Sequence, residues 1–259
     1  MSGRFLARGV ALMLAGPALA AAQDLPQSER YTLRVEYTRW SPDLSGDIQK
    51  GFGEAQGTPL DLSDDLGVAS ETTWEVRGTI RFGSSFKLKG AYVPLDRFLG
   101  DVSARTNFLY GAEQFFRGDR VLTAIDARYY RGEIQWDFQH GRQGFVGLLV
   151  GAKIFDVSSV VVNPDAGKRV IQDDTLPVPV IGLAGRTYYG RFSVEGEFSG
   201  MSLGSRGRVF EMNLYGRLNL SDRLAVGGGY QRVSLEGRDA RDFVSIKLAG
   251  WSYGVELSL

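Results

Sequence analysis

Few residues in this sequence have the type and spacing that catalysis needs, and the first to consider is the single histidine, His140. A histidine general base must lie within hydrogen-bond reach of the nucleophile or water that it activates. His140 falls in the polar segment 139–143, between two strand-like segments, where a solvated turn residue is expected. The chain has no Cys, which excludes a thiolate nucleophile, a disulfide scaffold and a thiolate zinc site.

Two other motifs contain residue types that bind ligands. Asp61, Asp64 and Asp65 offer the carboxylate oxygens that Ca²⁺ prefers, but the stretch lacks the spaced ligands and the closing Glu of an EF-hand. We expect these residues to solvate and cap a loop. The glycines 227–229 precede neither a helix nor a Lys-Ser/Thr pair, so they do not form a phosphate loop. The sequence therefore predicts no catalytic residue, no bound metal and no cofactor.

The composition narrows the class of protein further. Lys and Arg together number 30, as do Asp and Glu, so the chain lacks the positive field that non-specific nucleic-acid binding needs. No window approaches the ~18 consecutive apolar residues that indicate a transmembrane helix. The 34 glycines accompany 12% aromatic residues, and many fall in the middle of strand-like segments. Glycine at such positions suits a tightly curved sheet.

Residues 1–22 have the pattern of a secretory signal peptide. Arg4 and Arg8 provide the positive start, residues 9–15 form an apolar core too short to span a bilayer, and Ala20–Ala22 offers small residues for cleavage. We therefore expect export across the inner membrane and a mature chain of residues 23–259.

The mature chain alternates between apolar and polar residues with a period of two. In the segment 74–82, for example, Trp74, Val76 and Ile80 share one face, whereas Glu75 and Arg77 lie on the other. This pattern is typical of half-buried strands, because successive side chains of a strand point to opposite faces. The sequence predicts an all-β fold with ten antiparallel strands, with eight or twelve as alternatives.

The connections between these strands alternate between short and long, as in an up-and-down meander. The short ones are 83–85, 139–143, 188–191 and 219–223, and the longer ones are 40–70, 96–119, 163–175, 202–207 and 236–242. We expect small hairpins within 48–62 and 106–114. Val121 and Ile125 lie in the opposite register to the apolar residues that follow them, which indicates either a bulge or an extension beyond the sheet.

Three architectures fit two-faced strands: a membrane barrel with its apolar face outward, a soluble lipocalin-like barrel with its apolar face inward, and a β-sandwich. Aromatic residues mark both ends of most strands, as in the interfacial girdles of membrane barrels. Charges of both signs occupy the polar face on neighbouring strands, where they can pair across a narrow lumen. We therefore predict a transmembrane barrel whose lumen is lined by Arg34, Glu36, Glu75, Arg77, Arg81, Lys87, Lys89, Glu133, Asp137, Lys153, Glu195, Glu197, Glu211 and Arg217, with Arg131, Arg186 and Glu256 on the same face.

The C-terminus, Ser252-Tyr-Gly-Val-Glu-Leu-Ser-Leu259, resembles the barrel-assembly signal of the bacterial outer-membrane β-barrel superfamily. Ser252, Gly254, Leu257 and Leu259 occupy the places of that motif, although the family usually ends in Phe. The resemblance implies a barrel in the outer membrane, with short periplasmic turns and longer outer loops. It also implies outer-membrane lipid and the barrel-assembly machinery as partners.

Some outer-membrane barrels are enzymes, and the resemblance therefore raises the question of whether this chain has their catalytic residues. Lipid A deacylases and the outer-membrane phospholipase pair a His with a Ser, and the omptin proteases use an Asp–His pair at the outer rim. The alternation of connections places His140 at the opposite, periplasmic end. We therefore expect a non-enzymatic barrel with a side-chain-filled, charge-paired lumen, which acts structurally or through its outer loops. The alternatives are a narrow channel for small solutes and a soluble periplasmic barrel that binds a ligand.

Overall fold

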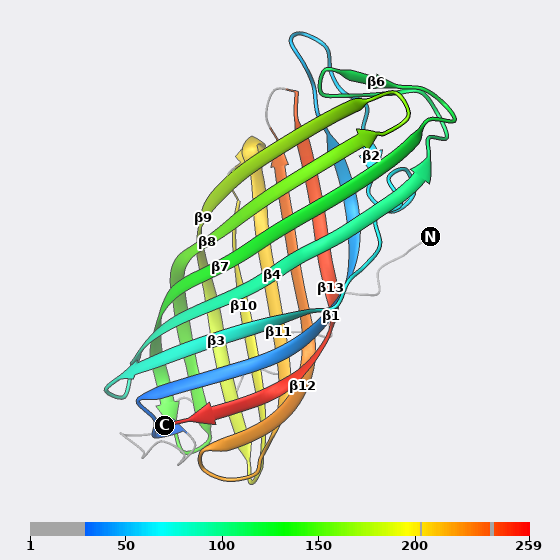
Figure 1. The fold of residues 1–259 in the computed structure, drawn as a ribbon. Helices are drawn as coiled ribbons and strands as arrows, with labels where there is room; N and C mark the ends of the chain where they lie inside the picture. The colour runs from blue at the N-terminus through cyan, green and yellow to red at the C-terminus, as the bar shows by residue number, and fades with distance from the viewer. Residues whose placement is uncertain (1–28, 203, 239–240) are drawn as a thin grey trace, which may run out of the picture.

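The computed structural model describes residues 29–202, 204–238 and 241–259, so the predicted signal peptide, residues 1–22, lies outside the described residues. Ten strands form a closed antiparallel barrel (Figure 1). In chain order they are β1 (Leu33–Gln49), β3 (Thr73–Phe82), β4 (Phe86–Ser103), β7 (Arg120–Gly141), β8 (Gly144–Asn163), β9 (Lys168–Tyr189), β10 (Phe192–Ser202), β11 (Gly207–Asn219), β12 (Leu224–Arg238) and β13 (Phe243–Ser258). The predicted fold class and strand number are confirmed.

The barrel closes between its first and last strands. β1 and β13 pair from Arg34 opposite Ser258 to Gln49 opposite Phe243 without a break in register. Every other barrel strand pairs with its neighbour in the chain, which makes the barrel an up-and-down meander. No helix of the described residues is long and apolar enough to cross a membrane.

Turns of two to four residues join the strands at one end of the barrel, which we call the short-turn end (Figure 1). At the other end, the long-hairpin end, only the connections 50–72 and 104–119 are long. The remaining three were expected to be longer, but they have four residues each, because their strands extend further. The long-hairpin end carries the minor elements. There β2 (Leu60–Asp61) pairs with β1, β5 (Phe108–Tyr110) pairs with β6 (Glu113–Phe115), and the 3₁₀ turn η2 (Gly204–Arg206) follows β10. The two small hairpins expected within 48–62 and 106–114 are therefore present.

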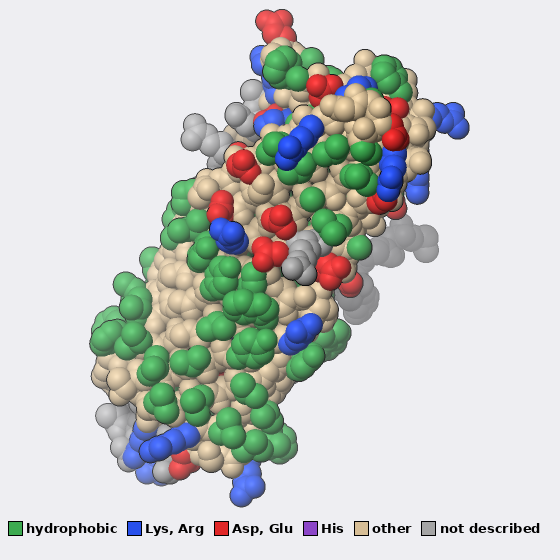
Figure 2. All heavy atoms as spheres, viewed as in Figure 1, with side chains coloured by type: hydrophobic (Ala, Val, Ile, Leu, Met, Phe, Trp, Pro, Cys, Tyr) green, Lys and Arg blue, Asp and Glu red, His purple; other side chains and the backbone are tan. Residues whose placement is uncertain are grey.

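The polarity of the two barrel faces inverts halfway along the strands. On β1, Arg34 and Glu36 are buried inside the short-turn half while Val35 and Tyr37 are exposed outside. From Trp40 onward the inward residues are apolar, and the outward ones are polar. Figure 2 shows the same division on the face in view: hydrophobic side chains cover much of the lower half, and charged ones gather on the upper half and at the lower tip. A soluble lipocalin-like barrel would have its apolar face inward along the whole strand. In the short-turn half the interior is charged and the outer surface is apolar.

This inversion corrects several predicted boundaries. Residues 40–49, 96–103 and 168–175 were expected in loops, but they belong to β1, β4 and β9. On β1 the outward residues of this segment are polar and the inward ones apolar, so a single apolar-outward pattern assigns them to a loop. On β9, Gln172 and Asp174 face inward and Ile171 faces outward, so neither pattern marks a strand there.

Val121 and Ile125 lie in the opposite register to the apolar residues that follow them, but neither a bulge on β7 beside them nor an extension beyond the sheet is the cause. Both side chains point inward on β7, on the same side as Arg131, and the pairing of β7 with β8 stays in register from residue 122 to 137. The pairing of β4 with β7 shifts opposite Ile125, but the extra residue lies on β4, between Leu95 and Phe98. A second shift lies between Asp137 and Gln139 on β7. The inward face of β7 changes from apolar to charged while the strand itself continues within the sheet.

Candidate functional site

The interior of the short-turn half is filled by charged side chains. The structure buries all fourteen of the predicted lumen residues, each with at most 8% of its surface exposed. Among the described residues, nine buried acids face nine buried bases. The acids are Glu29, Glu36, Glu75, Glu133, Asp137, Glu195, Glu197, Glu211 and Glu256, and the bases are Arg34, Arg77, Arg81, Lys87, Lys89, Arg131, Lys153, Arg186 and Arg217.

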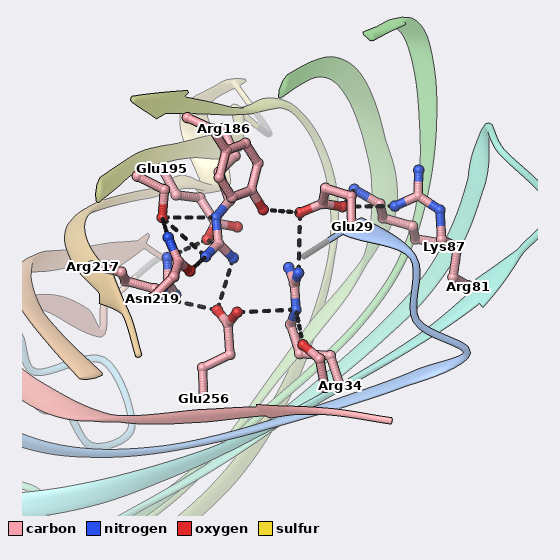
Figure 3. Close-up of polar contacts among 12 residues, drawn as sticks. Glu29, Arg34, Arg81, Lys87, Arg186, Glu195, Arg217, Asn219 and Glu256 are labelled. Carbon is pink, nitrogen blue, oxygen red and sulfur yellow. Dashed lines mark hydrogen bonds and ion pairs between the residues drawn. The ribbon is translucent and has the colours of Figure 1, made fainter. Parts of the chain in front are cut away.

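Glu29 anchors one cluster at the short-turn end (Figure 3). Its carboxylate lies 3.0 Å from the Arg34 guanidinium, 2.7 Å from that of Arg81 and 3.4 Å from the Lys87 ammonium. Asp137 faces the same cluster, 3.0 Å from Lys87 and 3.5 Å from Arg81. The chain segment just before β1 thus contributes the acid that gathers bases from β1, β3 and β4.

A second cluster adjoins the first across the barrel (Figure 3). Glu256 lies 2.8 Å from Arg186, 3.1 Å from Arg217 and 3.4 Å from Arg34, and so links β13 to β9, β11 and β1. Arg217 also pairs with Glu195 and, at 2.5 Å, with Glu36. Because each guanidinium donates in several directions, these pairs join strands that are not neighbours in the sheet.

A third cluster, centred on Glu211, lies closer to the middle of the barrel. Glu211 accepts hydrogen bonds from Arg131 at 2.8 Å, from Asn213 at 2.6 Å, and from Lys153 and the Tyr129 hydroxyl. Glu133, on the same strand as Arg131, is held less well. Its nearest ionic partner is Arg131 at 3.7 Å, and neither carboxylate oxygen has a hydrogen-bond partner among the described residues.

These clusters leave little free space in the lumen. A cavity of about 10 Å³, close to the space that one water molecule needs, lies beside Glu36 and Arg217. Most of these charges have partners on other strands, so they hold those strands in place, and Glu133 is the exception. The buried side chains of these clusters therefore occupy much of the interior of this half.

Several interior residues were missed by the sequence analysis. Glu29 precedes the first strand, where no alternation marks its direction. Tyr215, Asn213 and Gln231 lie on the inward face that the alternation indicated, but they carry no charge and were not singled out. The ring of Tyr215 stacks under Arg77 and Arg217, and Gln231 donates to Glu75 at 3.0 Å. These neutral polar residues could have been identified in the sequence from their position on the same strand face as the charged lumen residues.

The other candidate motifs lie away from these clusters. His140 is at the end of β7 beside the turn to β8, at the short-turn end, as the sequence indicated. Asp61 caps a turn, because its carboxylate accepts from the backbone amides of Ser63 and Asp64 at 2.8 and 2.6 Å. No group of three or more His, Asp or Glu with metal-binding geometry occurs in the described part of the chain.

The C-terminal motif forms the closing seam of the barrel. Leu257 and Leu259 point outward and are exposed, whereas Ser252 is buried inside. Gly254 faces Thr38 of β1 so closely that an added Cβ would lie 2.1 Å from the Tyr37 carbonyl oxygen. The glycine of the motif is therefore required by strand packing at this position.

No protein-family model matches the chain, and no curated protein matches it in sequence. Among solved structures, the fold is similar to that of the outer membrane protease OmpT from Escherichia coli, with a TM-score of 0.60 and 11% identity over 88% of this chain and 96% of that one. The toluene transporter TodX from P. putida matches with a TM-score of 0.35 and 7% identity over 92% of this chain and 93% of that one. OprG from Pseudomonas aeruginosa matches with a TM-score of 0.33 and 14% identity, over 88% and 94% of the two chains. Identities this low relate folds alone, and this chain has the fold of a closed up-and-down β-barrel similar to that of OmpT.

Proposed function

We propose that this chain is a non-enzymatic protein of the bacterial outer membrane, whose barrel is closed at membrane level and which acts through its long-hairpin end outside the cell. The single observation that carries the proposal is the charge-balanced interior of the short-turn half. The side chains of nine acids and nine bases are buried there and pair across the lumen, so the barrel does not serve as an open pore.

The outer face supports the membrane location. Tyr37, Trp74, Tyr92 and Tyr130 form a row across β1, β3, β4 and β7, with ring centroids 6.4, 5.6 and 5.1 Å apart. A second set of exposed aromatic residues, including Phe82, Phe86 and Phe138, lies at the short-turn end. Two aromatic rows with aliphatic residues between them are typical of a barrel in a bilayer. Export by the predicted signal peptide and folding by the barrel-assembly machinery belong to the same proposal.

The placement of the only histidine supports the absence of hydrolytic activity. A histidine base would have to reach a substrate at the exposed, long-hairpin end, whereas His140 lies at the opposite end of the barrel. Most of the buried carboxylates of the interior are held in close ion pairs, which removes them as free acids or bases.

Conductance measurements test the proposal against the channel alternative. Protein reconstituted into planar bilayers should give no steady channel openings, while heat-modifiable migration in gels shows that it is folded. As a positive control, Arg217→Ser removes the side chain that bridges Glu36, Glu195 and Glu256, and it should produce small cation-selective currents. Steady openings of the wild-type protein would overturn the closed-barrel proposal, as would recovery of the protein from the periplasm without detergent.

A further inference from the structure

The barrel wall has an opening at the long-hairpin end, between β9 and β11. β9 begins at Lys168, but its pairing with β10 reaches only Ile181, opposite Gly200. No backbone hydrogen bond joins residues 168–180 of β9 to any described segment other than β8. On the far side of the opening, β11 starts at Gly207 and pairs with β12.

Two prolines account for the end of this ladder. The amide of Tyr188 donates to Gln143 on the β8 side, so even-numbered amides of β9 point toward β8 and odd-numbered ones toward β10. Residue 179 would be the next to donate to β10 after Ile181, and it is a proline, as is residue 177. Proline has no N–H to donate, so the β9–β10 ladder stops there.

A comparable gap on the other side of the barrel is filled by the chain itself. Between β1 and β4, the segment 62–70 crosses the wall and bonds to both strands. The amide of Leu62 donates to Gly46 at 2.9 Å, and that of Ala69 donates to Leu99 at 3.1 Å. Leu62 and Leu66 are fully buried in the core there. The η2 turn after β10 is too short to cover the second gap in the same way.

The second gap opens into a cavity of about 370 Å³ inside the long-hairpin half. Inward-facing residues on both sides of the gap line it. Leu176 of β9 belongs to the inward face but remains 36% exposed, because it lies at the opening. The wall behind it is mostly apolar and comprises Ile48, Tyr110, Ile125, Phe155, Val157, Val178, Val209, Leu235, Val244 and Ile246.

The floor of the cavity separates it from the charged lumen. The ring of Phe155 lines the cavity and stacks on Tyr129 with centroids 4.9 Å apart, while the Tyr129 hydroxyl donates to Glu211 below. Val178 and Val209, 1% and 3% exposed, complete the boundary. The cavity therefore ends at an apolar layer and does not continue into the lumen.

The charged residues at the rim contact other groups of the protein, and Asp174 accepts a hydrogen bond from the side-chain amide of Gln172. Arg208 lies 2.5 Å from Glu236, and Asp242 accepts from the Gly51 amide at 2.9 Å and faces Lys50 at 3.5 Å. Arg238 lies over the Phe243 ring. Burial raises the pKa of the Tyr110 phenol above its ordinary value, which keeps that wall residue neutral. An apolar cavity with a satisfied rim favours an uncharged ligand.

We propose that this cavity binds an uncharged, mainly apolar small molecule, which enters sideways through the gap between β9 and β11. A cavity of ~150 Å³ lined by aliphatic and aromatic residues binds benzene, so a cavity more than twice that size accommodates a fused two-ring molecule or a comparable aliphatic chain. The proposal does not depend on the barrel being closed at membrane level.

Equilibrium dialysis of 2-naphthol against the amphipol-bound protein tests the proposal. The wild-type protein should bind one 2-naphthol per barrel in a saturable manner. Binding of 2-naphthalenesulfonate should be weaker by at least about tenfold, because its charge must be desolvated. Val209→Trp places a large ring in the cavity and should weaken 2-naphthol binding about tenfold or more. The matched control is Val194→Trp on the outer face of neighbouring β10, which should bind like the wild type.

Two outcomes would overturn the proposal. One is an absence of saturable binding to wild-type protein that is shown to be folded by its heat-modifiable migration. The other is equal binding by wild type, Val209→Trp and Val194→Trp, which would mean that the probe partitions into the amphipol or the outer face. Val209→Phe provides a smaller insertion if Val209→Trp does not fold, and it should weaken binding in the same direction.

Discussion

Individual carboxylates inside this barrel have very different surroundings although they are equally buried. Glu211 has four hydrogen-bonding partners from three strands, whereas Glu133 has one distant guanidinium and no hydrogen bond to the described residues. A buried charge stabilises the fold only when its partners repay its lost hydration. The two residues therefore allow a direct comparison within one lumen.

We predict that Glu211→Gln lowers the free energy of unfolding by about 3 kcal/mol, because it leaves Lys153 and Arg131 without their main acid. Glu133→Gln should change it by less than about 1 kcal/mol, since it removes a charge that is poorly paired. Urea unfolding in lipid vesicles, followed by the loss of heat-modifiable migration, measures both variants. Equal losses of stability would show that position in the lumen matters more than pairing.

At the scale of elements, the strands could be located from the sequence but their ends could not. Alternation fixes the inward and outward sides of β3 and β10, because charged and apolar residues separate cleanly there. It fails where the solvent outside the strand changes, because a polar outward residue is then indistinguishable from a loop residue. Glu29 escaped prediction for a similar reason, since its place inside the barrel depends on a turn before the first strand.

The prolines of β9 allow a test of what ends a strand ladder. Pro179→Val restores a donor opposite Ser202, so the new amide should form a hydrogen bond and exchange slowly with solvent. Hydrogen exchange measured by mass spectrometry should show protection at residue 179 and the facing part of β10. The gain of about 1 kcal/mol from the bond is largely offset by the freedom that valine adds to the unfolded chain.

Pro177→Val is the matched control for that variant. Residue 177 would face the η2 turn rather than a strand, so its new amide should exchange rapidly. Protection at both positions would indicate that β10 extends further than its present end when a donor is available. Protection at neither position would show that the prolines do not determine where the ladder stops.

At the scale of the whole molecule, two kinds of packing share one barrel. The short-turn half has a charged interior and an apolar surface, and the long-hairpin half has an apolar interior and a polar surface. Each half is suited to a different surrounding solvent, lipid for the first and water for the second. This division could not be predicted from the overall composition, because composition counts apolar and charged residues without saying which face of the strand they occupy.

Single-cysteine labelling on the outer face of β1 should locate the boundary between the halves, since the chain has no Cys of its own. Ser45→Cys should react with a membrane-impermeant maleimide on intact cells, because its side chain is exposed on the polar part of the strand. Val35→Cys should remain unreactive, and a fluorophore attached there after purification should be quenched by brominated lipid in vesicles. Labelling of Val35→Cys on intact cells, or lipid quenching at Ser45→Cys, would contradict this arrangement.

The inversion along β1 also sets the vertical position of the molecule. Sliding the barrel along the membrane normal by one residue pair would bring Arg39 and Ser41 into hydrocarbon or Tyr37 into water, so the depth of insertion is fixed by the strand itself. From Trp40 to Gln49 the strand runs about 30 Å at ~3.3 Å per residue, which a tilt of ~40° reduces to a height of about 20–25 Å. The long hairpins therefore extend beyond the hydrocarbon layer from a height that the outward face of β1 sets.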